Sequence, residues 1–487
     1  MNALPVFLGT KVSRNDRRYE TLIRGFNLRW VGNPSFVQVV GDADQVRETV
    51  QNAVSKHMRI TVRGGGHCYE NFVSENDDGV IIDLSPLNGV YKENRMIVVE
   101  GGCTLWNVYW HMYKNWGLTI PGGSCYSVGV GGHVCGGGYG LLSRLYGLTV
   151  DYLAGVEVVV VNQKRQAKIV QAWKNDGDSQ KRDLFWAHTG GGGGNFGVVT
   201  KYFFRNPPSA PDKAWLVNIA WNWSDLDEAK FAQLIGNYGE FFEQHSGLNS
   251  EYNGLFTLLG LSHKSAKQIV LTAQYVGDQP DLLHNFINAM RVDDVSHVGQ
   301  LYSVGYHHHL GPDTSIRGLP WLYATQSFNR SGPNQRGKYK SAYMRKPFPN
   351  RQIPIMFKWL TDSNYDNPQA LLQVDSYGGQ VNAIRKTDTA DVHRDSILIL
   401  QYQTYWTEES EDSRNLEWIR GFYNEMYGED GPCPDEYFDG CFVNYPDVDL
   451  SPWQELYYGE NYPRLQQVKQ QWDPHNIFNH QQSIELP

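Results

Sequence analysis

Three glycine-rich segments, and the reactive side chains beside them, are the first candidates for chemistry in this chain. The segments cover residues 64–66, 121–140 and 190–194; His67 follows the first, and Cys125 lies within the second. A glycine lets backbone N–H groups come close to a phosphate or a flat ring, and a cysteine thiolate is a good nucleophile. One such segment could be a tight turn. Three of them indicate one long cofactor that lies across several loops.

The third segment also contains a formal dinucleotide fingerprint, Gly192-x-Gly194-x-x-Gly197. That fingerprint must open a helix to bind a pyrophosphate. Residues 198–204 instead read Val-Val-Thr-Lys-Tyr-Phe-Phe, which is typical of a strand. The sequence therefore argues against a Rossmann NAD site.

The elements that must position these segments alternate between strand and helix. Helical spacing of apolar residues predicts a helix over residues 44–54, with Asp42 or Asp44 as its N-cap. A continuous apolar run at 156–161 predicts a strand buried on both faces. This alternation predicts an α/β unit over roughly the first 205 residues. Further strands are expected at residues 59–63, 79–83 and 96–100, and a further helix near 104–114.

A proline-rich connector at residues 205–212 marks a plausible boundary. Beyond it, a predicted helix at 228–242 alternates with predicted strands at 268–275 and 396–402, which suggests a second unit of mixed helix and strand. The tail is expected to be helical over residues 459–471 and to stop before Pro474.

Composition excludes several classes of function. The 487 residues are 41% hydrophobic and 20% charged, as in a globular protein of two or three domains. A formal net charge of -9 without a basic run argues against nucleic acid as a partner. No apolar stretch reaches the roughly 18 residues of a membrane span, so no membrane partner is expected. The first residues lack a basic, cleavable signal, which favours the cytoplasm and leaves secretion open.

Metal sites are not expected either. The six cysteines form no CxxC pair, so neither zinc nor a disulfide framework is predicted. His307, His308 and His309 are adjacent, and neighbouring side chains of an extended chain point to opposite sides. We expect them in a loop or in the lining of a substrate pocket rather than around a metal ion.

The motifs around His67 and Cys125 resemble those of one family. Residues 63–69 read Arg-Gly-Gly-Gly-His-Cys-Tyr, and residues 121–140 read Pro-Gly-Gly-Ser-Cys-Tyr-Ser-Val-Gly-Val-Gly-Gly-His-Val-Cys-Gly-Gly-Gly-Tyr-Gly. Near the C-terminus, residues 444–447 read Asn-Tyr-Pro-Asp. Together they look like the flavin-binding segments of the berberine bridge enzyme-like FAD-linked oxidases, within the vanillyl-alcohol oxidase superfamily. The resemblance is strongest to bicovalent sugar and antibiotic-tailoring oxidases, and it is loose over residues 206–430.

The resemblance implies an α+β fold with a two-part FAD-binding domain of the vanillyl-alcohol oxidase type. Residues 1–205 and 431–487 would form that domain. Residues 206–430 would form an inserted substrate-binding domain, built on a large antiparallel sheet that covers the isoalloxazine ring. The boundary agrees with the proline-rich connector.

The resemblance also implies two covalent bonds to FAD. An imidazole nitrogen of His67 would bond to the flavin 8α-methyl carbon, and the thiolate of Cys125 would bond to flavin C6. His133 lies in a Gly-Gly-His turn, where a structural role is favoured. The other residues implied in FAD binding are Arg63, Gly64, Gly65, Gly66, Cys68, Gly122, Ser124, Val128, Gly129, Gly132, Gly136, Gly137, Gly193, Asn195, Gly197, Val199, Asn444 and Tyr445.

Three tyrosines are the implied catalytic residues. Alcohol oxidation needs a base at the hydroxyl and a hydride acceptor. Tyr445 matches the family's base, although a free phenol with a pKa of about 10 needs help at neutral pH. Tyr139 matches a second active-site tyrosine that would contact substrate or stabilise the Tyr445 phenolate. Tyr377 would be a third polar contact in the substrate domain.

The expected function is FAD-dependent oxidation of an alcohol carbon of a sugar or secondary metabolite to a carbonyl, with O2 reduced to H2O2. One alternative is oxidative cyclisation or dehydrogenation of an alkaloid or polyketide. Its odds fall because the carboxylate base of the alkaloid-cyclising relatives has no clear match. Another alternative is a noncatalytic flavin- or sugar-binding protein.

Overall fold

The N-terminal part of the chain forms a small sheet backed by one long helix. The computed structural model describes residues 7–299, 316–329 and 331–487. Strands β2 (Phe36–Val39), β4 (Val80–Asp83) and β3 (Ile60–Arg63) are parallel, and β1 (Thr10–Ser13) pairs with β2 in the antiparallel sense. Helix α2 (Ala43–Ser55) buries its apolar face between this sheet and the strands at residues 153–161 and 167–173, and α1 (Tyr19–Leu22) lies beside β2. Of the two predicted N-caps, Asp42 is the one that accepts from the backbone N–H of Gln45 (2.8 Å).

Two of the glycine segments lie in the connections between strands of a second, five-stranded sheet. Its order is β5 (Val90–Glu93), β6 (Met96–Glu100), β9 (Val198–Phe204), β7 (Leu153–Val161), β8 (Ala167–Trp173). Every pair is antiparallel, and β7 is largely buried, as its apolar run predicted. The strand after the third glycine segment is β9, so the argument against a Rossmann site is confirmed. The helices of this region are α3 (Leu105–Trp116), α4 (Val130–Cys135), α5 (Ser143–Tyr146) and α6 (Ser179–Ala187).

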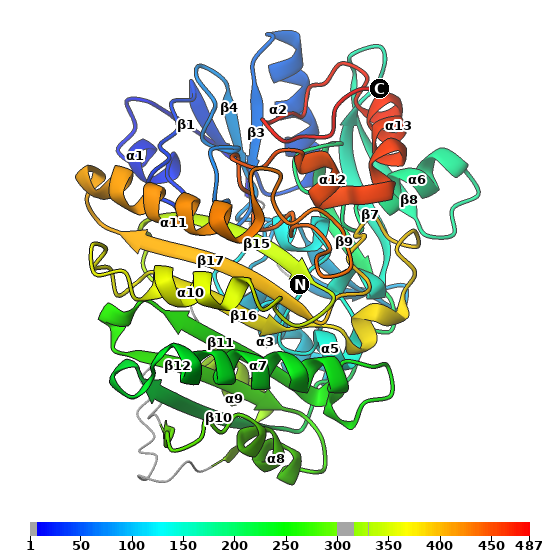
Figure 1. Ribbon diagram of the computed structural model, residues 1–487. Coiled ribbons are helices and arrows are strands. Elements are labelled where there is room, and N and C mark those ends of the chain that lie inside the picture. Colours follow the sequence, from blue (N-terminus) through cyan, green and yellow to red (C-terminus); the bar gives the residue numbers. More distant parts are fainter. Residues whose placement is uncertain (1–6, 300–315, 330) are drawn as a thin grey trace.

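The middle of the chain forms a large antiparallel sheet of eight strands (Figure 1). The chain passes from one sheet to the other between Phe204 and Lys213, within the proline-rich connector. The order is β13 (Val298–Gly299), β10 (Lys213–Asn222), β12 (Gln268–Tyr275), β11 (Leu255–Ser262), β16 (Leu371–Ser376), β17 (Leu398–Trp406), β15 (Arg336–Met344), and β14 (Arg317–Pro320) also pairs with β10.

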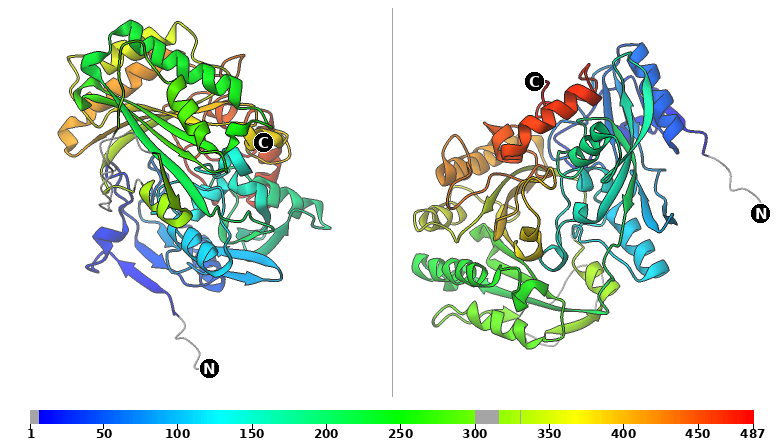
Figure 2. Two further views of the ribbon diagram at one scale, coloured as in Figure 1. Left: turned by 90° about the horizontal axis from the view of Figure 1, so that it is seen from below. Right: turned by 90° about the vertical axis from the view of Figure 1, so that its right-hand side faces the viewer.

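Helices cover one face of this sheet (Figures 1 and 2). They are α7 (Glu228–His245), α8 (Asp281–Ala289), α10 (Gln352–Leu360) and α11 (Asp412–Tyr427), while α9 (Trp321–Ser327) lies against β10 and α3. The opposite face of the central strands is free to form the wall of a site. The short 3-10 helices are η1 (Thr149–Tyr152), η2 (Trp223–Asp225), η3 (Glu251–Gly254), η4 (Lys264–Ala266), η5 (Gly379–Ala383), η6 (Glu409–Glu411) and η7 (Gly459–Asn461).

The C-terminal segment returns to the N-terminal half of the chain. Helices α12 (Trp453–Tyr458) and α13 (Tyr462–Trp472) pack near α6 (Figure 1). The predicted tail helix therefore exists and ends before Pro474. The mixed fold with a large antiparallel sheet is confirmed, and the division into two domains stays a prediction. Within the described residues, no helix combines the length and the apolar character needed to cross a membrane.

Candidate active site

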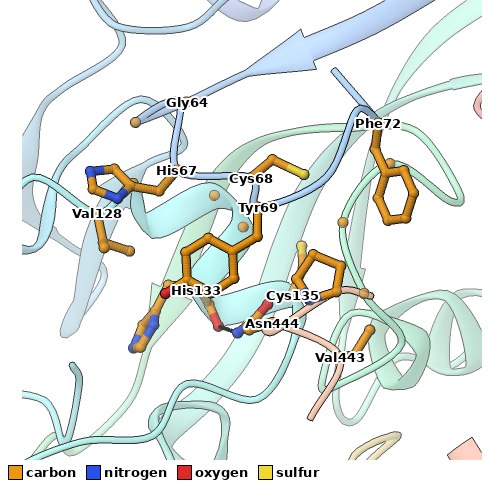
Figure 3. A pocket seen from close by; sticks show the side chains of 18 of the residues that line it. Gly64, His67, Cys68, Tyr69, Phe72, Val128, His133, Cys135, Val443 and Asn444 are labelled. Atoms are coloured by element: carbon orange, nitrogen blue, oxygen red, sulfur yellow. Dashed lines mark hydrogen bonds between the residues drawn. The ribbon is translucent and has the colours of Figure 1, made fainter. Parts of the chain in front are cut away.

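One large cavity lies where the glycine loops face the uncovered side of the eight-stranded sheet. Its volume is about 420 Å³, and its walls come from residues 60–73, 101–140, 188–202, the central sheet strands and the C-terminal segment. Segments far apart in the sequence therefore meet at one place. Figure 3 shows His67, Cys68 and Tyr69 leading from the first glycine loop along this cavity.

Most of the predicted cofactor and catalytic residues line this cavity. The structure brings together Arg63, Gly64, Gly65, Gly66, His67, Cys68, Ser124, Cys125, Val128, Gly129, Gly132, His133, Tyr139, Gly193, Asn195, Gly197, Val199, Asn444 and Tyr445. These residues therefore lie together in the wall of one cavity. Their roles toward a cofactor or a substrate stay predictions.

Gly122, Gly136 and Gly137 lie behind the wall instead of in it. At Gly136, a Cβ atom would stand 2.2 Å from Oδ1 of Asn444, so glycine is needed there for packing. Asn444 in turn donates from Nδ2 to the carbonyl oxygen of His133 (3.0 Å; Figure 3). These glycines therefore support the residues of the wall without facing the cavity.

Tyr377 is also placed differently from its prediction. Its side chain is fully buried, and its hydroxyl donates to the carbonyl oxygen of His393 (3.1 Å). It packs behind Tyr139, with ring centroids 5.1 Å apart, and does not line the cavity. β16 ends at Ser376 and Gly378 turns the chain with a φ of +83°, so strand alternation no longer decides where Tyr377 points. Direct contact with substrate is therefore not supported for Tyr377.

The glycines that line the cavity leave room for a flat or charged ligand. A Cβ atom on Gly65 would stand 2.3 Å from the backbone nitrogen of Gly129, so the first two glycine loops touch only because both lack side chains. At Gly132, by contrast, a Cβ atom would meet no atom of the described residues within 4 Å. Side chains there would project into the space that a cofactor needs.

His67 is neutral and close to the Cys125 loop. Its Nε2 lies 2.9 Å from Oγ of Ser127, two residues after Cys125. Its ring stacks on Phe26 with centroids 4.6 Å apart. Burial lowers the pKa of His67 to about 4, so at neutral pH a ring nitrogen keeps the lone pair that a covalent bond would use.

Cys125 is half-buried at the same end of the cavity. Burial, and to a lesser extent the charge that a Cys125 thiolate would carry, raises the pKa of Tyr69 and of Tyr445, and all three residues line the same cavity. The two predicted attachment residues and the predicted base therefore share one region of the cavity.

Tyr445 is half-buried among aromatic rings. Its ring lies 5.8 Å from that of Tyr69 and 5.0 Å from that of Phe442, measured between centroids. Burial, and then the negative charges that Tyr69 and Asp375 would carry, raise the pKa of Tyr445 well above its ordinary value. The hydroxyl is therefore protonated at neutral pH in this arrangement.

Tyr139 is oriented by a hydrogen bond of its own. Its hydroxyl donates to the carbonyl oxygen of Ser376, at the end of β16. Because a phenol has one proton to donate, this hydroxyl can only accept a further hydrogen bond while that bond is kept. Donation to a Tyr445 phenolate would require the bond to break.

A row of polar side chains on the sheet was not predicted from the sequence. Gln401, Gln403 and Tyr405 alternate along β17, and Gln373 and Asp375 alternate along β16, all facing the cavity. Register pairs Gln373 with Gln401 directly. Polar residues at every second position of an otherwise apolar strand were the available signal.

These side chains form a hydrogen-bonded chain that reaches Tyr69. Tyr405 donates to Oε1 of Gln403 (2.8 Å), and Gln403 donates to Oε1 of Gln401 (2.9 Å). Gln401 then donates to the hydroxyl of Tyr69 (3.1 Å). Tyr69 lies inside the motif at residues 63–69, yet its place beside Tyr445 was not foreseen. The cavity thus has one wall rich in amide and hydroxyl groups.

A buried lysine ties the C-terminal segment to the third glycine loop. Nζ of Lys469, fully buried, donates to the carbonyl oxygens of Asn195 (2.7 Å) and Phe478 (2.6 Å) and to Asp473 (2.8 Å). Asn195 also accepts at Oδ1 from the backbone N–H of Ile484 (2.8 Å). The loop that lines the cavity is thereby fixed by residues from the last turns of the chain.

Replacing Lys469 with methionine is expected to destabilise the protein by about 3–5 kcal/mol, because Asp473 would be left as an uncompensated buried charge. The loop at Asn195 would also lose an anchor, so the flavin content should fall. Urea unfolding and the absorbance ratio of flavin to protein measure both effects. Arg464→Met is the matched control on α13, because its ion pair with Asp183 is about 40% exposed (42% and 44%) and should contribute under about 1 kcal/mol. If both variants lost the same amount of stability and of flavin, Lys469 would not be an anchor for the loop at Asn195.

Comparison with known proteins decides which family this site belongs to. A family model described as FAD binding domain matches residues 34–164, and one described as berberine and berberine like matches residues 441–485. The chain is 40% identical to aclacinomycin-N/aclacinomycin-A oxidase of Streptomyces galilaeus, over 98% of this chain and 90% of the relative. This chain belongs to the berberine bridge enzyme-like FAD-linked oxidases. It is also 37% identical to hexose oxidase of Chondrus crispus, over 96% of this chain and 93% of the relative.

Solved structures of berberine bridge enzyme-like oxidases share the whole fold. Aclacinomycin oxidoreductase matches with a TM-score of 0.91 and 39% identity, over 99% of this chain and 100% of that one. Glycopeptide hexose oxidase, complexed with teicoplanin, matches with a TM-score of 0.91 and 37% identity over the same shares. The recognition made from the motifs is confirmed.

The cavity of this berberine bridge enzyme-like oxidase fits FAD. Loops that lack Cβ atoms at Gly65, Gly129 and Gly132 form a cradle, and the neutral His67 stands at its edge. FAD is therefore the cofactor of this protein, and its covalent attachment stays a proposal. In the part of the chain that the structure covers, no group of three metal-ligating side chains occurs. His307, His308 and His309 lie outside the described residues.

Proposed function

We propose that this oxidase converts an alcohol carbon of a sugar or sugar-bearing metabolite to a carbonyl, with O2 reduced to H2O2. The observation that carries the proposal is the cavity itself. A tyrosine hydroxyl, that of Tyr445, shares it with a wall of amide and hydroxyl groups on β16 and β17. A ligand with many hydroxyls can pair with the donors and acceptors of this wall that its internal hydrogen bonds leave over, whereas a hydrocarbon cannot. The names of two relatives, a hexose oxidase and a glycopeptide hexose oxidase, agree with a sugar.

The proposed residues would each do one task. His67 and Cys125 would hold FAD, which when bound supplies the hydride acceptor and returns the electrons to O2. Tyr445 would take the hydroxyl proton as the C–H bond breaks. Gln401 and Gln403 would orient the other hydroxyls of the substrate. The hydroxyl of Tyr69 would accept or donate a hydrogen bond beside the reacting carbon. The overall change is one alcohol plus O2 giving one carbonyl plus H2O2.

A panel of sugars tests this function directly. D-glucose, D-galactose, maltose, cellobiose and a glycosylated anthracycline would each be incubated with the flavin-loaded protein, and H2O2 followed by a peroxidase-coupled assay. We expect about one H2O2 for each carbonyl formed. Absence of H2O2 and of flavin bleaching with every compound would remove the sugar proposal.

Product structure separates this proposal from its enzymatic alternative. Mass spectrometry would show the loss of two hydrogens and a carbonyl for alcohol oxidation, and a new ring for oxidative cyclisation. A noncatalytic flavin- or sugar-binding protein is no longer an alternative, because the chain belongs to a family of oxidases.

A further inference from the structure

Two lysines of the edge strand β15 are buried among carboxylates next to the catalytic cavity. The side chains of Lys338 and Lys340 are 1% and 3% exposed, and those of Glu70 and Asp447 are 1% and 0% exposed. Asp449 completes the cluster and is paired outward with Arg420 at 2.8 Å. None of these charges faces the cavity, so the oxidation chemistry does not use them directly.

Lys338 joins the two loops that carry the cavity tyrosines. Its Nζ lies 2.5 Å from Oε1 of Glu70 and 2.6 Å from Oδ1 of Asp447. Glu70 directly follows Tyr69, and Asp447 is the second residue after Tyr445. One ammonium group therefore bonds to the loop of each tyrosine, although the loops are more than 370 positions apart (447 − 70 = 377).

Lys340 contacts only one of these loops. Its Nζ lies 2.7 Å from Oδ2 of Asp447 and 3.4 Å from Oδ2 of Asp449. No contact with Glu70 is found for it among the described residues. The two lysines thus share strand, burial and charge, and differ in whether they join the loops.

The same strand also fixes Tyr69 by its ring and its backbone. Tyr339, next to Lys338 in β15, stacks on Tyr69 with centroids 3.6 Å apart and planes at 13°. Nδ2 of Asn27 donates to the carbonyl oxygens of both Tyr69 (2.6 Å) and Gly337 (3.0 Å). Tyr69 therefore has its ring, its carbonyl and its next residue all held against β15.

Stability alone does not explain the cluster. A buried ion pair is often no more stabilising than apolar residues of the same size, because both charges lose their hydration. Burial raises the pKa of Glu70, and its Oε2 has no hydrogen-bond partner among the residues that the structure describes. Burial alone would lower the pKa of Lys338, but Asp447 and Glu70 outweigh it and keep the ammonium charged. What a buried ion-pair cluster does supply is a fixed distance between the groups that it joins, here the loops of Glu70 and Asp447.

We propose that Lys338 is a positioning residue for the oxidation. By bonding to Glu70 and Asp447 at once, it sets the spacing of Tyr69 and Tyr445, whose rings lie 5.8 Å apart in the cavity. A shift of about 1 Å in a reacting group can lower a rate about 100-fold. This inference rests on the proposed function, because its kinetic test uses a sugar.

The test compares Lys338→Met with Lys340→Met in the flavin-loaded protein. Each variant removes one buried ammonium from the same strand. We expect Lys338→Met to lower the limiting rate of flavin reduction at least about tenfold, measured by anaerobic stopped flow with the sugar that turns over fastest. Its acid-stable flavin content should match the wild type. Lys340→Met should change the limiting rate less than about threefold, because Tyr69 and Tyr445 stay joined.

Glu70→Leu keeps the test decisive if Lys338→Met does not fold. It cuts the link at its other end, together with the hydrogen bond from the backbone N–H of Val448 to Oε1 of Glu70 (3.4 Å), and should reproduce the slow reduction. Equal limiting rates in Lys338→Met and Lys340→Met, or a defect that appears only in KM, would overturn the proposal. If no sugar reduces the wild-type flavin, the proposed function fails instead. The positioning role is then decided by crystal structures of both lysine variants, since an unchanged spacing of Tyr69 and Tyr445 in Lys338→Met would refute it.

Discussion

Tyr445→Phe is expected to lower the rate of flavin reduction by about 10²–10⁴-fold, the usual contribution of a positioned general base. The ring keeps its packing against Tyr69 and Phe442, so only the hydroxyl is lost. FAD should remain bound at the wild-type level. Anaerobic stopped-flow absorbance with an active sugar measures the rate, and absorbance of the acid-washed protein measures the flavin.

Tyr139→Phe is the matched comparison for that variant. Its hydroxyl also lies in the cavity wall but donates to the carbonyl oxygen of Ser376. We expect a smaller loss, on the order of tenfold, because orientation rather than proton transfer is affected. A Tyr445→Phe enzyme that is reduced as fast as the wild type would remove Tyr445 as the base.

The pH dependence follows from the raised pKa of Tyr445. As a base, Tyr445 would react in its phenolate form, and the phenolate fraction rises with pH as long as the pH is below that pKa. The limiting rate of flavin reduction in the wild type should therefore increase from about pH 6 to about pH 9, with no plateau below the ordinary tyrosine pKa of about 10. In Tyr445→Phe this rise should disappear. Stopped-flow measurements of flavin reduction across that pH range, in the wild type and in Tyr445→Phe, test this prediction. Protein stability is checked at each pH.

Removing both His67 and Cys125 is expected to abolish covalent flavin. Cys125→Ala should retain all its flavin through His67 after acid denaturation, and His67→Ala should retain flavin through Cys125. The double variant should release all of it. The positions of the two residues support this expectation. His67 and Cys125 both line the cavity, and His67 contacts Ser127, two residues after Cys125.

Mass spectrometry of the digested pellet identifies the linked peptides. In the wild type, one adduct should join the His67 and Cys125 peptides through FAD. Cys68→Ala is the matched control, since Cys68 lies beside His67 in the same wall and its thiol pKa is raised to about 11 by burial. The Cys68→Ala variant should keep both covalent bonds to the flavin, through His67 and through Cys125. Flavin that washes out of Cys125→Ala would show that His67 is not an attachment residue.

The motifs that are short in sequence could be predicted because each is a local structure. His67 follows directly on three glycines, and Cys125 lies in another glycine segment, so the loop and its reactive residue are encoded together. The structure places both in the cavity wall. The same holds for Asn444 and Tyr445, which are adjacent. Helix α2 and strand β7 followed from apolar periodicity and from an apolar run.

Tyr377 shows where local reasoning stops. Its sequence neighbours Gln373 and Asp375 face the cavity, but the strand ends before Tyr377 and the chain turns at Gly378. Which way the ring then points is decided by packing against Tyr139, Tyr343 and His393. No pattern in residues 371–377 contains that information.

By itself the sequence determined the family, the cofactor and the residues that stand on the glycine loops, because these depend on neighbours along the chain. Only the tertiary structure decided the polar wall and the Lys338 link. The wall exists because the register of β16 and β17 sets Gln373 opposite Gln401. The link exists because the edge strand β15 lies between two loops that are distant in sequence. Contacts of that range are set by how sheets and loops pack, and packing is a property of the whole chain.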